Sequence, residues 1–489
     1  MKDKIVVPYA PILVESTRSI GYSFEAAVAD IIDNSISAAA TEIRVCFSSQ
    51  DPQWLSIEDD GWGMSADELE NAMRYGSQSS QDTRRKDDLG RFGLGLKMAS
   101  LSQCRKVTVI SKKNGQVHAA CWDLDYIVQQ GNWALKFFSE EETQDIQGCS
   151  WLDVHDSGTV VLWEQFDRLR QGALKVQKAF DEKIEITRKH VALVFHRFLS
   201  DDNPRNRMDI YFNGEAVTGI DPFLTKHPAT QPLSEQVLRI GTEEILVKPY
   251  VLPYLNKMSK KDLEIIGGKD ELRQQQGFYI YRNKRLIIWG TWFRLIKQNE
   301  LGKLARVRVD IPNSLDSIWE IDIKKSTASL PHFIKKNLAD IVENTVGRSE
   351  RVYKYRGRNV QTDNLIHIWN PIDDRGKLQY QINRDLPVIN MIEHHLDEEG
   401  LSLLDSFIKM MEDAFPYADV YYRMAKSEAN VTESALETND VCIIADQMVQ
   451  QVASSGADVS AFIKSMDKMD FFIKYPDVIR QIREVYEDY

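Results

Sequence analysis

Three short polar motifs near the N-terminus most constrain what this 489-residue chain can fold into. They are Asp30–Asn34 (Asp-Ile-Ile-Asp-Asn), Asp59–Met64 (Asp-Asp-Gly-Trp-Gly-Met) and Gly90–Lys97 (Gly-Arg-Phe-Gly-Leu-Gly-Leu-Lys). Together they supply an amide and a carboxylate, a second carboxylate beside two glycines, and a glycine loop whose backbone N–H groups can bind an anion. One glycine-rich string alone would be weak evidence, but three complementary parts in this order predict a nucleotide-binding site.

The first motif lies on a predicted helix. Ser23 is suited to cap it, and apolar residues follow at helical spacing, namely Phe24, Ala27, Val28, Ile31 and Ile32. Asp30 and Asn34 are four positions apart and share one face of that helix. A carboxylate there can polarise a water molecule, and an amide oxygen suits Mg²⁺. Taken alone, the pattern also fits an ordinary amphipathic helix with a solvated acidic face.

The second and third motifs are predicted at a strand end and in a loop. Trp54–Ile57 has strand character, and the glycines after it allow close approach of a flat ligand while Asp59 accepts a hydrogen bond from an exocyclic amine. A hairpin turn with a solvated acidic pair is the alternative. Gly90–Gly95 reverses the dinucleotide-binding order and lacks a following Gly-Lys-Ser/Thr, so a flexible surface loop is its alternative.

In combination, the motifs resemble those of GHKL-type ATPases, the superfamily of gyrase B subunits, ninety-kilodalton heat-shock chaperones, histidine kinases and MutL mismatch-repair proteins. The run Asn34–Ile43 resembles the segment after the magnesium-binding asparagine in MutL-like members, and Asp156–Val161 resembles the family's Gly-Thr strand motif. The resemblance implies ATP and Mg²⁺ as ligands. It also implies that Asn34 holds the metal, that Asp59 binds the adenine amino group, and that Thr159 supports Asp59.

The resemblance further implies an ATP lid from about Tyr75 to Gly95 that closes over the phosphates. The full set of nucleotide contacts that it implies is Asn34, Asp59, Gly61, Gly63, Met64, Gly90, Arg91, Phe92, Gly93, Leu94, Gly95, Lys97 and Thr159.

Asp30 departs from the family pattern, because most hydrolytic relatives have glutamate four residues before the asparagine. An aspartate places its carboxylate one methylene nearer the backbone, whereas proton transfer needs heavy atoms about 2.6–3.2 Å apart. The site is therefore either an adapted ATPase or one that binds ATP and hydrolyses it very slowly. Since the MORC-like branch has similar Asp-x-Ile-Asp-Asn sequences, the resemblance favours slow hydrolysis with Asp30 as the catalytic base.

The expected fold class is α+β, in three parts. A Bergerat-type α/β sandwich ATPase domain covers residues 1–175, with strands expected in 105–125 and 150–166. An S5-like transducer domain covers 176–345, with a strand pair around Asn283-Lys284. A helix-rich region covers 346–489.

The resemblance also implies that a transducer lysine contacts the γ-phosphate. Lys324 and Lys325 are the candidates, and Lys325 is preferred, because only one of two adjacent strand residues can face the site. An ammonium there stabilises the charge that develops during phosphoryl transfer. A lysine pair that ends a surface strand is the alternative.

Composition indicates a globular cytoplasmic protein. The chain is 43% hydrophobic and 27% charged, its five cysteines are scattered, and no apolar run approaches the roughly 18–20 residues that span a membrane. A net charge of −12 argues against a strongly basic nucleic-acid-binding surface. Basic residues nevertheless gather at 84–86, in a predicted loop over 257–269, and at 348–358, where a solvated helix face is the simpler interpretation.

The sequence therefore predicts an ATP-gated homodimer similar to prokaryotic MORC-like and MutL-like ATPases, over about residues 10–345. Its expected role is clamp closure on DNA in a defence or repair pathway, with partner proteins of that pathway and no membrane. The alternative is a chaperone-like or signalling scaffold that binds ATP and acts on protein partners without nucleic acid.

Overall fold

A computed structural model of the chain separates into two compact units, residues 1–354 and 355–489. The residues that it describes are 8–19, 21–75, 95–172, 175–201, 203, 207–268, 271–300, 302–315, 319, 332–354, 366–374, 377–417, 419–420, 436–454, 456 and 458–486.

The first unit begins with an eight-stranded sheet in the order β5-β4-β3-β6-β2-β1-β7-β8. The strands are β1 Glu42–Ser48, β2 Trp54–Asp59, β3 Lys106–Lys113, β4 Gln116–Asp123, β5 Lys136–Phe137, β6 Gly158–Glu164, β7 Asp209–Phe212 and β8 Glu215–Ala216. Neighbouring strands are antiparallel, except that β1 and β7 are parallel. The strands expected within 105–125 and 150–166 are thereby confirmed.

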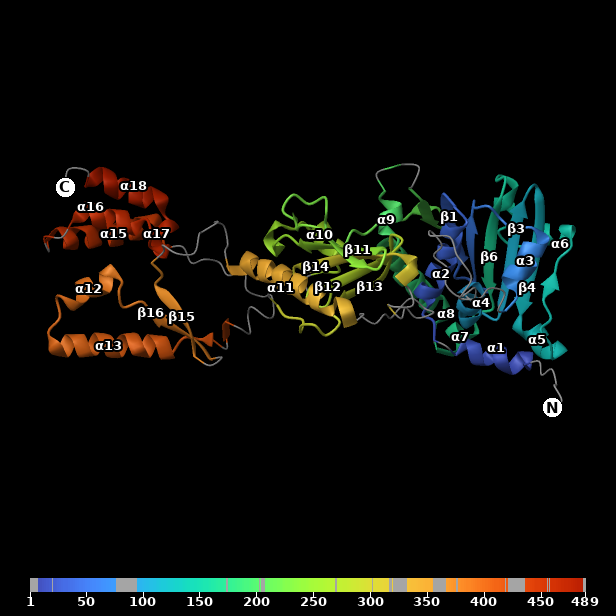
Figure 1. Ribbon diagram of the computed structural model, residues 1–489, viewed down its shortest axis with the longest axis horizontal. Coiled ribbons are helices and arrows are strands. Elements are labelled where there is room, and N and C mark those ends of the chain that lie inside the picture. The colour runs from blue at the N-terminus through green and yellow to red at the C-terminus, as the bar shows by residue number, and fades with distance from the viewer. Residues whose placement is uncertain are drawn as a thin grey trace. The chain divides into compact units, whose positions relative to one another are not determined.

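Helices cover one face of this sheet, as Figure 1 shows for α2, α4 and α8. The helices of this part are α1 Ala10–Arg18, α2 Phe24–Ser37, α3 Ala66–Met73, α4 Gly95–Gln103, α5 Leu124–Gln130, α6 Glu140–Gln144, α7 Asp167–Gly172, α8 Val176–Val194 and α9 His196–Leu199, with a short 3₁₀ helix, η1 Cys149–Asp153. Along β6, Val161 and Trp163 face the main core, whereas Val160 joins a smaller cluster near η1. This alternation explains why the strand is apolar on both faces.

The core of the first sheet continues past residue 175. Phe180 on α8 is fully buried and packs edge-on against Phe24 and Phe166, with ring centroids 6.1 and 5.3 Å apart. Strands β7 and β8 then extend the sheet itself. A domain boundary at 175/176 stays a prediction, but the first sheet draws on residues from both sides of it.

The second sheet has six strands, five of them in the order β10-β11-β14-β12-β13, with β9 paired to β11. Its strands are β9 Gln231–Pro232, β10 Gln236–Ile240, β11 Glu243–Val251, β12 Gly277–Arg282, β13 Arg285–Thr291 and β14 Ala305–Ile311. The remaining elements are η2 Leu255–Lys257, α10 Lys260–Ile265, η3 Asn313–Leu315 and α11 His332–Lys354. Helix α11 packs on β11 and β14, and its buried residues join the core of the sheet.

Two local predictions can be compared with this sheet. The strand pair around Asn283-Lys284 is confirmed as the β12–β13 hairpin. The loop expected over 257–269 is wrong in part, because Lys260 and Lys261 lie on α10. Ser259 caps this helix by accepting a hydrogen bond from the Asp262 backbone N–H.

The described residues of the second unit form one strand pair and several helices. These are β15 Trp369–Asp374, β16 Lys377–Ile382, α12 Pro387–Glu393, α13 Glu398–Asp413, α15 Thr438–Ser454, α16 Val459–Met466, α17 Asp470–Ile473 and α18 Pro476–Val485. An apolar core joins α15, α16, α17 and α18. The α+β class and the helix-rich C-terminal region are confirmed, whereas the S5-like character of the second domain stays a prediction.

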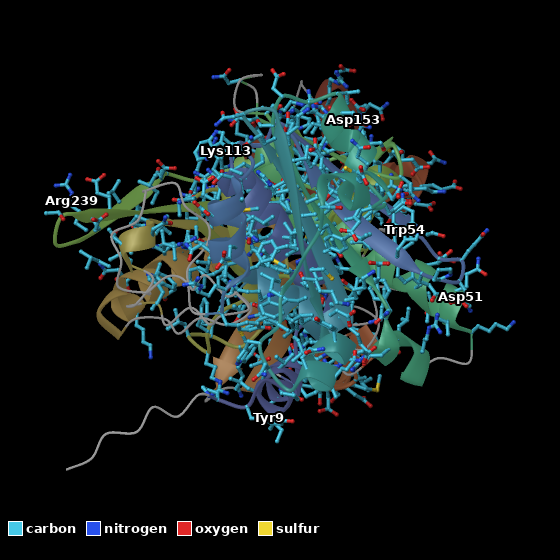
Figure 2. The ribbon with its side chains drawn as sticks, turned by 90° about the vertical axis from the view of Figure 1, so that its right-hand side faces the viewer. Tyr9, Asp51, Trp54, Lys113, Asp153 and Arg239 are labelled. Carbon is cyan, nitrogen blue, oxygen red and sulfur yellow. The ribbon has the colours of Figure 1, made fainter. Side chains whose placement is uncertain are left out.

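The helices and the surface each show one further feature. In the described parts of the chain, no helix is both long and apolar enough to cross a membrane. Figure 2 looks onto the chain with side chains drawn, and Tyr9, just before α1, projects outward with 58% of its surface exposed.

Substitution of Phe180 tests whether α8 belongs to the core of the first sheet. We expect Phe180→Ala to lower the free energy of unfolding by about 3–5 kcal/mol, because it leaves a cavity among aromatic rings. Ile186→Ala on the same helix is the control, since Ile186 is 54% exposed and should change stability by less than about 1 kcal/mol. Equal effects in chemical denaturation would contradict this packing.

Candidate nucleotide-binding site

Helix α2 presents the first motif as expected. The Ser23 side chain accepts a hydrogen bond from the Ala26 backbone N–H and caps the helix. Asp30 and Asp33 are buried, at 4% and 0% exposure, whereas Asn34 is exposed. The amide of Asn34 is therefore accessible to a ligand, while both carboxylates lie in the protein interior.

Asp59 ends β2 and lies beside helix α2. Its carboxylate accepts a hydrogen bond from Ser35 Oγ at 2.7 Å and another from the Gly61 backbone N–H at 3.0 Å. Ser35, the residue that follows Asn34, thus holds the Asp59 carboxylate against helix α2. The first and second motifs, 24 positions apart at this contact, meet in one place.

Ionisation of the Asp59 carboxylate is unfavourable in this buried position. Burial is the main cause that raises its pKa to about 6, and the hydrogen bonds from Ser35 and Gly61 oppose that rise. A further hydrogen-bond donor, such as an exocyclic amine, would stabilise the ionised form of this buried carboxylate.

Both glycines of the second motif are required by close backbone approaches. A Cβ on Gly61 would lie 2.8 Å from Ala38 Cβ, and one on Gly63 would lie 1.8 Å from the Lys112 carbonyl oxygen. Gly63 also has a positive φ of 64°. The segment after Asp59 is therefore pressed between the end of α2 and strand β3.

Thr159 and Met64 lie close to Asp59 through a small polar network. Thr159 is the direct cross-strand partner of Asp59 in the β2–β6 pair. Ser111 Oγ lies 3.0 Å from Thr159 Oγ1 and accepts a hydrogen bond from the Met64 backbone N–H at 2.8 Å. The structure thus brings the Gly-Thr strand motif to the second motif, as the sequence predicts.

Asp30 lies on the same helix as Asn34, one turn earlier. Tyr22 Oη donates a hydrogen bond to Asp30 Oδ2 at 3.0 Å. The start of α4 is adjacent, because a Cβ on Gly95 would lie 3.9 Å from that same oxygen. The last glycine of the third motif therefore lies beside the predicted base, with a helix N-terminus that favours an anion.

The comparison with known families agrees with this geometry. Residues 22–159 match the family described as histidine kinase-, DNA gyrase B- and HSP90-like ATPases. Residues 22–159 are a GHKL-type ATPase domain. The matched range contains Asp30, Asn34, Asp59 and Thr159, which the fold brings onto α2 and the adjoining strand ends.

Two curated proteins are similar over parts of the chain. ATPase morc-1 of Caenorhabditis elegans is 30% identical over 94 residues, which are 19% of this chain and 11% of that protein. Putative MutL protein homolog 1 of Schizosaccharomyces pombe is 31% identical over 156 residues, 31% of this chain and 21% of that protein. The chain thus spans about a tenth and a fifth of these relatives.

A solved structure is similar in outline. It is described as the crystal structure of the N-terminal domain of a DNA repair protein, and the match covers 70% of this chain and 98% of that chain. The sequence identity is 17% and the TM-score is 0.44.

The donor set of the ATPase domain fits a magnesium ion that keeps ligands from outside the protein. In the described ranges, no group of three or more histidine, cysteine, aspartate or glutamate side chains could hold a metal ion. Asn34 offers a hard amide oxygen at an exposed position. Magnesium typically takes one or two protein oxygens together with phosphate and water oxygens, and Asn34 is the residue that would hold it.

Lys97 has its polar contacts at the end of α3. Its ammonium donates hydrogen bonds to the carbonyls of Ala72 and Arg74, both at 2.8 Å, at the end of α3. Burial lowers its pKa to about 8. Here Lys97 joins α4 to the end of α3, and its contact with the nucleotide stays a prediction.

Several predicted residues lie outside the described parts of the chain. They are Gly90, Arg91, Phe92, Gly93 and Leu94 of the third motif, and Lys324 and Lys325 of the second domain. Their roles stay predictions.

Sequence reasoning missed four side chains of the ATPase site, which are Tyr22, Ser35, Ser111 and Arg285. Ser35 directly follows Asn34, and a hydroxyl beside a motif is a signal that could have been used. Arg285 follows the predicted Asn283-Lys284 turn, but no local pattern indicates its contacts with α2.

The buried environment of Asp59 predicts that the stability of the fold depends on pH. Since the folded-state pKa of Asp59 is raised, the protonated form contributes stability that is fully present below its usual pKa near 4 and lost as pH rises through about 6. We expect Asp59→Asn to be more stable than the wild type by about 1–3 kcal/mol above pH 7, with little difference near pH 4. ATP affinity should fall about tenfold or more, because the side-chain NH2 group of the new asparagine would face the adenine amino group. Both groups are hydrogen-bond donors, so the hydrogen bond to adenine is lost.

Thermal unfolding at several pH values and calorimetric titration with ATP measure these two effects. A stability difference that does not change with pH would contradict the buried-carboxylate explanation.

Proposed function

We propose that this protein binds ATP with Mg²⁺ and hydrolyses it slowly. The observation that carries the proposal is the buried Asp59 carboxylate, held by Ser35 beside two glycines that the packing requires. The match of residues 22–159 to an ATPase family supports it. Asp59 accepts a hydrogen bond from the adenine amino group, and Gly61 and Gly63 let the purine approach the backbone.

Asp30 is the base in this mechanism. Its carboxylate takes a proton from the water that attacks the γ-phosphate, which requires that water to lie within about 2.6–3.2 Å. Tyr22 fixes one oxygen of Asp30, and the start of α4 at Gly95 lies beside it. Asn34, one turn further along α2, is the residue for Mg²⁺, which would neutralise phosphate charge.

Substitution of Asp30 tests the catalytic role. We expect Asp30→Asn to reduce kcat about 100-fold or more, because the amide cannot accept the proton. ATP affinity should stay within about threefold, since Asp30 does not contact the base or the metal in this mechanism. Steady-state phosphate release and calorimetry measure the two quantities, and unchanged turnover would remove Asp30 from the mechanism.

We further propose that ATP closes a homodimeric clamp and that hydrolysis reopens it. In this cycle ATP orders the lid, two ATPase domains meet, and Lys325 or Lys324 completes the site. The resemblance of the motifs to MORC-like and MutL-like ATPases, and the similarity to one protein of each name, support this cycle. We also propose action on DNA with partner proteins of a prokaryotic defence or repair pathway, which rests on the resemblance of the motifs.

A second candidate function is a chaperone-like or signalling scaffold that acts on proteins. The net charge of −12 favours it, because a protein with a net negative charge repels nucleic acid. In that case hydrolysis depends on a protein partner and is indifferent to DNA.

Retention of DNA separates the two functions. With a non-hydrolysable ATP analogue, a clamp should keep circular DNA bound through a wash at high salt, because closure holds it topologically. Without nucleotide, or with linear DNA, the same wash should release it, since electrostatic contacts weaken steeply with salt. Equal retention of circular and linear DNA contradicts the clamp, and no retention with DNA-independent hydrolysis favours the scaffold.

A further inference from the structure

The β12–β13 hairpin of the second sheet reaches the ATPase domain through its turn. Asn283 and Lys284 have φ values of 49° and 68°, the geometry of a tight two-residue hairpin turn. Lys284 Nζ forms an ion pair with Asp201 Oδ2 at 2.7 Å, just after α9. The next residue, Arg285, is buried between the two domains, with 4% of its surface exposed.

Arg285 contacts both carboxylates of the first motif. Its Nε lies 2.7 Å from Asp33 Oδ1, and its Nη2 lies 3.7 Å from Asp30 Oδ1. All three side chains are at most 5% exposed. The contact joins residues that are 252 positions apart in the chain.

Because Asp30 and Asp33 are buried, their carboxylates need a partner of a particular chemistry. Two carboxylates removed from water require a nearby cation or hydrogen-bond donors. A guanidinium can serve both, because its planar fork carries donors in several directions, whereas an ammonium is a compact point charge. The Phe195 ring, 5.7 Å from Arg285 Cζ, lines the same space.

The two carboxylate oxygens of Asp30 thereby face side chains from two different domains. Oδ2 accepts the Tyr22 hydroxyl within the ATPase domain, while Oδ1 faces the guanidinium of Arg285 from the second sheet. Asp33, which binds Arg285 directly, is followed in the chain by Asn34. Displacement of the hairpin would therefore remove the contacts that orient the predicted base.

We propose that Arg285 is a positioning residue for Asp30, so that ATP hydrolysis requires the β12–β13 hairpin to be docked against α2. This inference rests on the proposed ATPase function. Arg285 anchors Asp33 and faces Asp30, and it holds the base carboxylate in one orientation. When the hairpin is displaced the nucleotide still binds through Asp59, but Asp30 loses its alignment.

Arg285→Met tests this role with Lys284→Met as the matched control. We expect Arg285→Met to lower kcat about 10- to 100-fold, as expected for a misplaced catalytic group, with the Kd for ATP within about threefold of the wild type. Lys284→Met removes an ion pair from the same turn without a contact to α2, and its kcat should stay within about twofold. Arg285→Lys should recover part of the loss, because it keeps a positive charge.

Three results would overturn the proposal. They are a kcat for Arg285→Met within about threefold of the wild type, an equal loss in Lys284→Met, and a kcat for Arg285→Lys no higher than that for Arg285→Met. If thermal melting shows that Arg285→Met does not fold, the double variant Arg285→Gln, Asp33→Asn replaces the ion pair with a neutral pair and is judged by the same criteria. A wild type that neither binds nor hydrolyses ATP would instead refute the proposed function itself.

Discussion

The removal of carboxylates from water around helix α2 is the constraint on which the rest of the structure depends. Asp30, Asp33 and Asp59 are all buried, and each is held by a side chain from outside its own helix or strand. Ser35 binds Asp59, Tyr22 binds Asp30, and Arg285 binds Asp33. Because an unpartnered buried charge costs several kcal/mol, these contacts fix how helix, sheet and hairpin meet.

Exposure then separates the roles on this helix. Asn34 is exposed, whereas the side chains that orient the carboxylates, Ser35, Tyr22 and Arg285, are themselves buried. Burial raises the pKa of Asp59, so an ionised carboxylate in this position lowers the stability of the unliganded fold. A hydrogen bond from a ligand offsets part of that cost.

The second sheet contributes to the same helix through one hairpin. Its turn has two positive φ values, and the next residue, Arg285, forms the ion pair with Asp33 on α2. A hairpin that contacts the predicted base can influence hydrolysis without itself contacting the nucleotide. This arrangement gives a physical route by which the position of a neighbouring domain could control the chemistry of the ATPase domain.

Local features were predictable from the sequence because they depend on neighbouring residues. Helical spacing from Ser23 to Asn34, the strand that ends at Asp59, and the Asn283-Lys284 turn all follow from short-range patterns of apolar residues, caps and turn formers. The association of the motifs with ATP came from their combined resemblance to a family. No local pattern indicates the partners of a buried side chain, and the tertiary structure alone decided those. It directed Lys97 to the end of α3 and brought Arg285 to Asp33 across 252 positions, because burial forces each charge to find its partner among whatever elements the fold packs beside it.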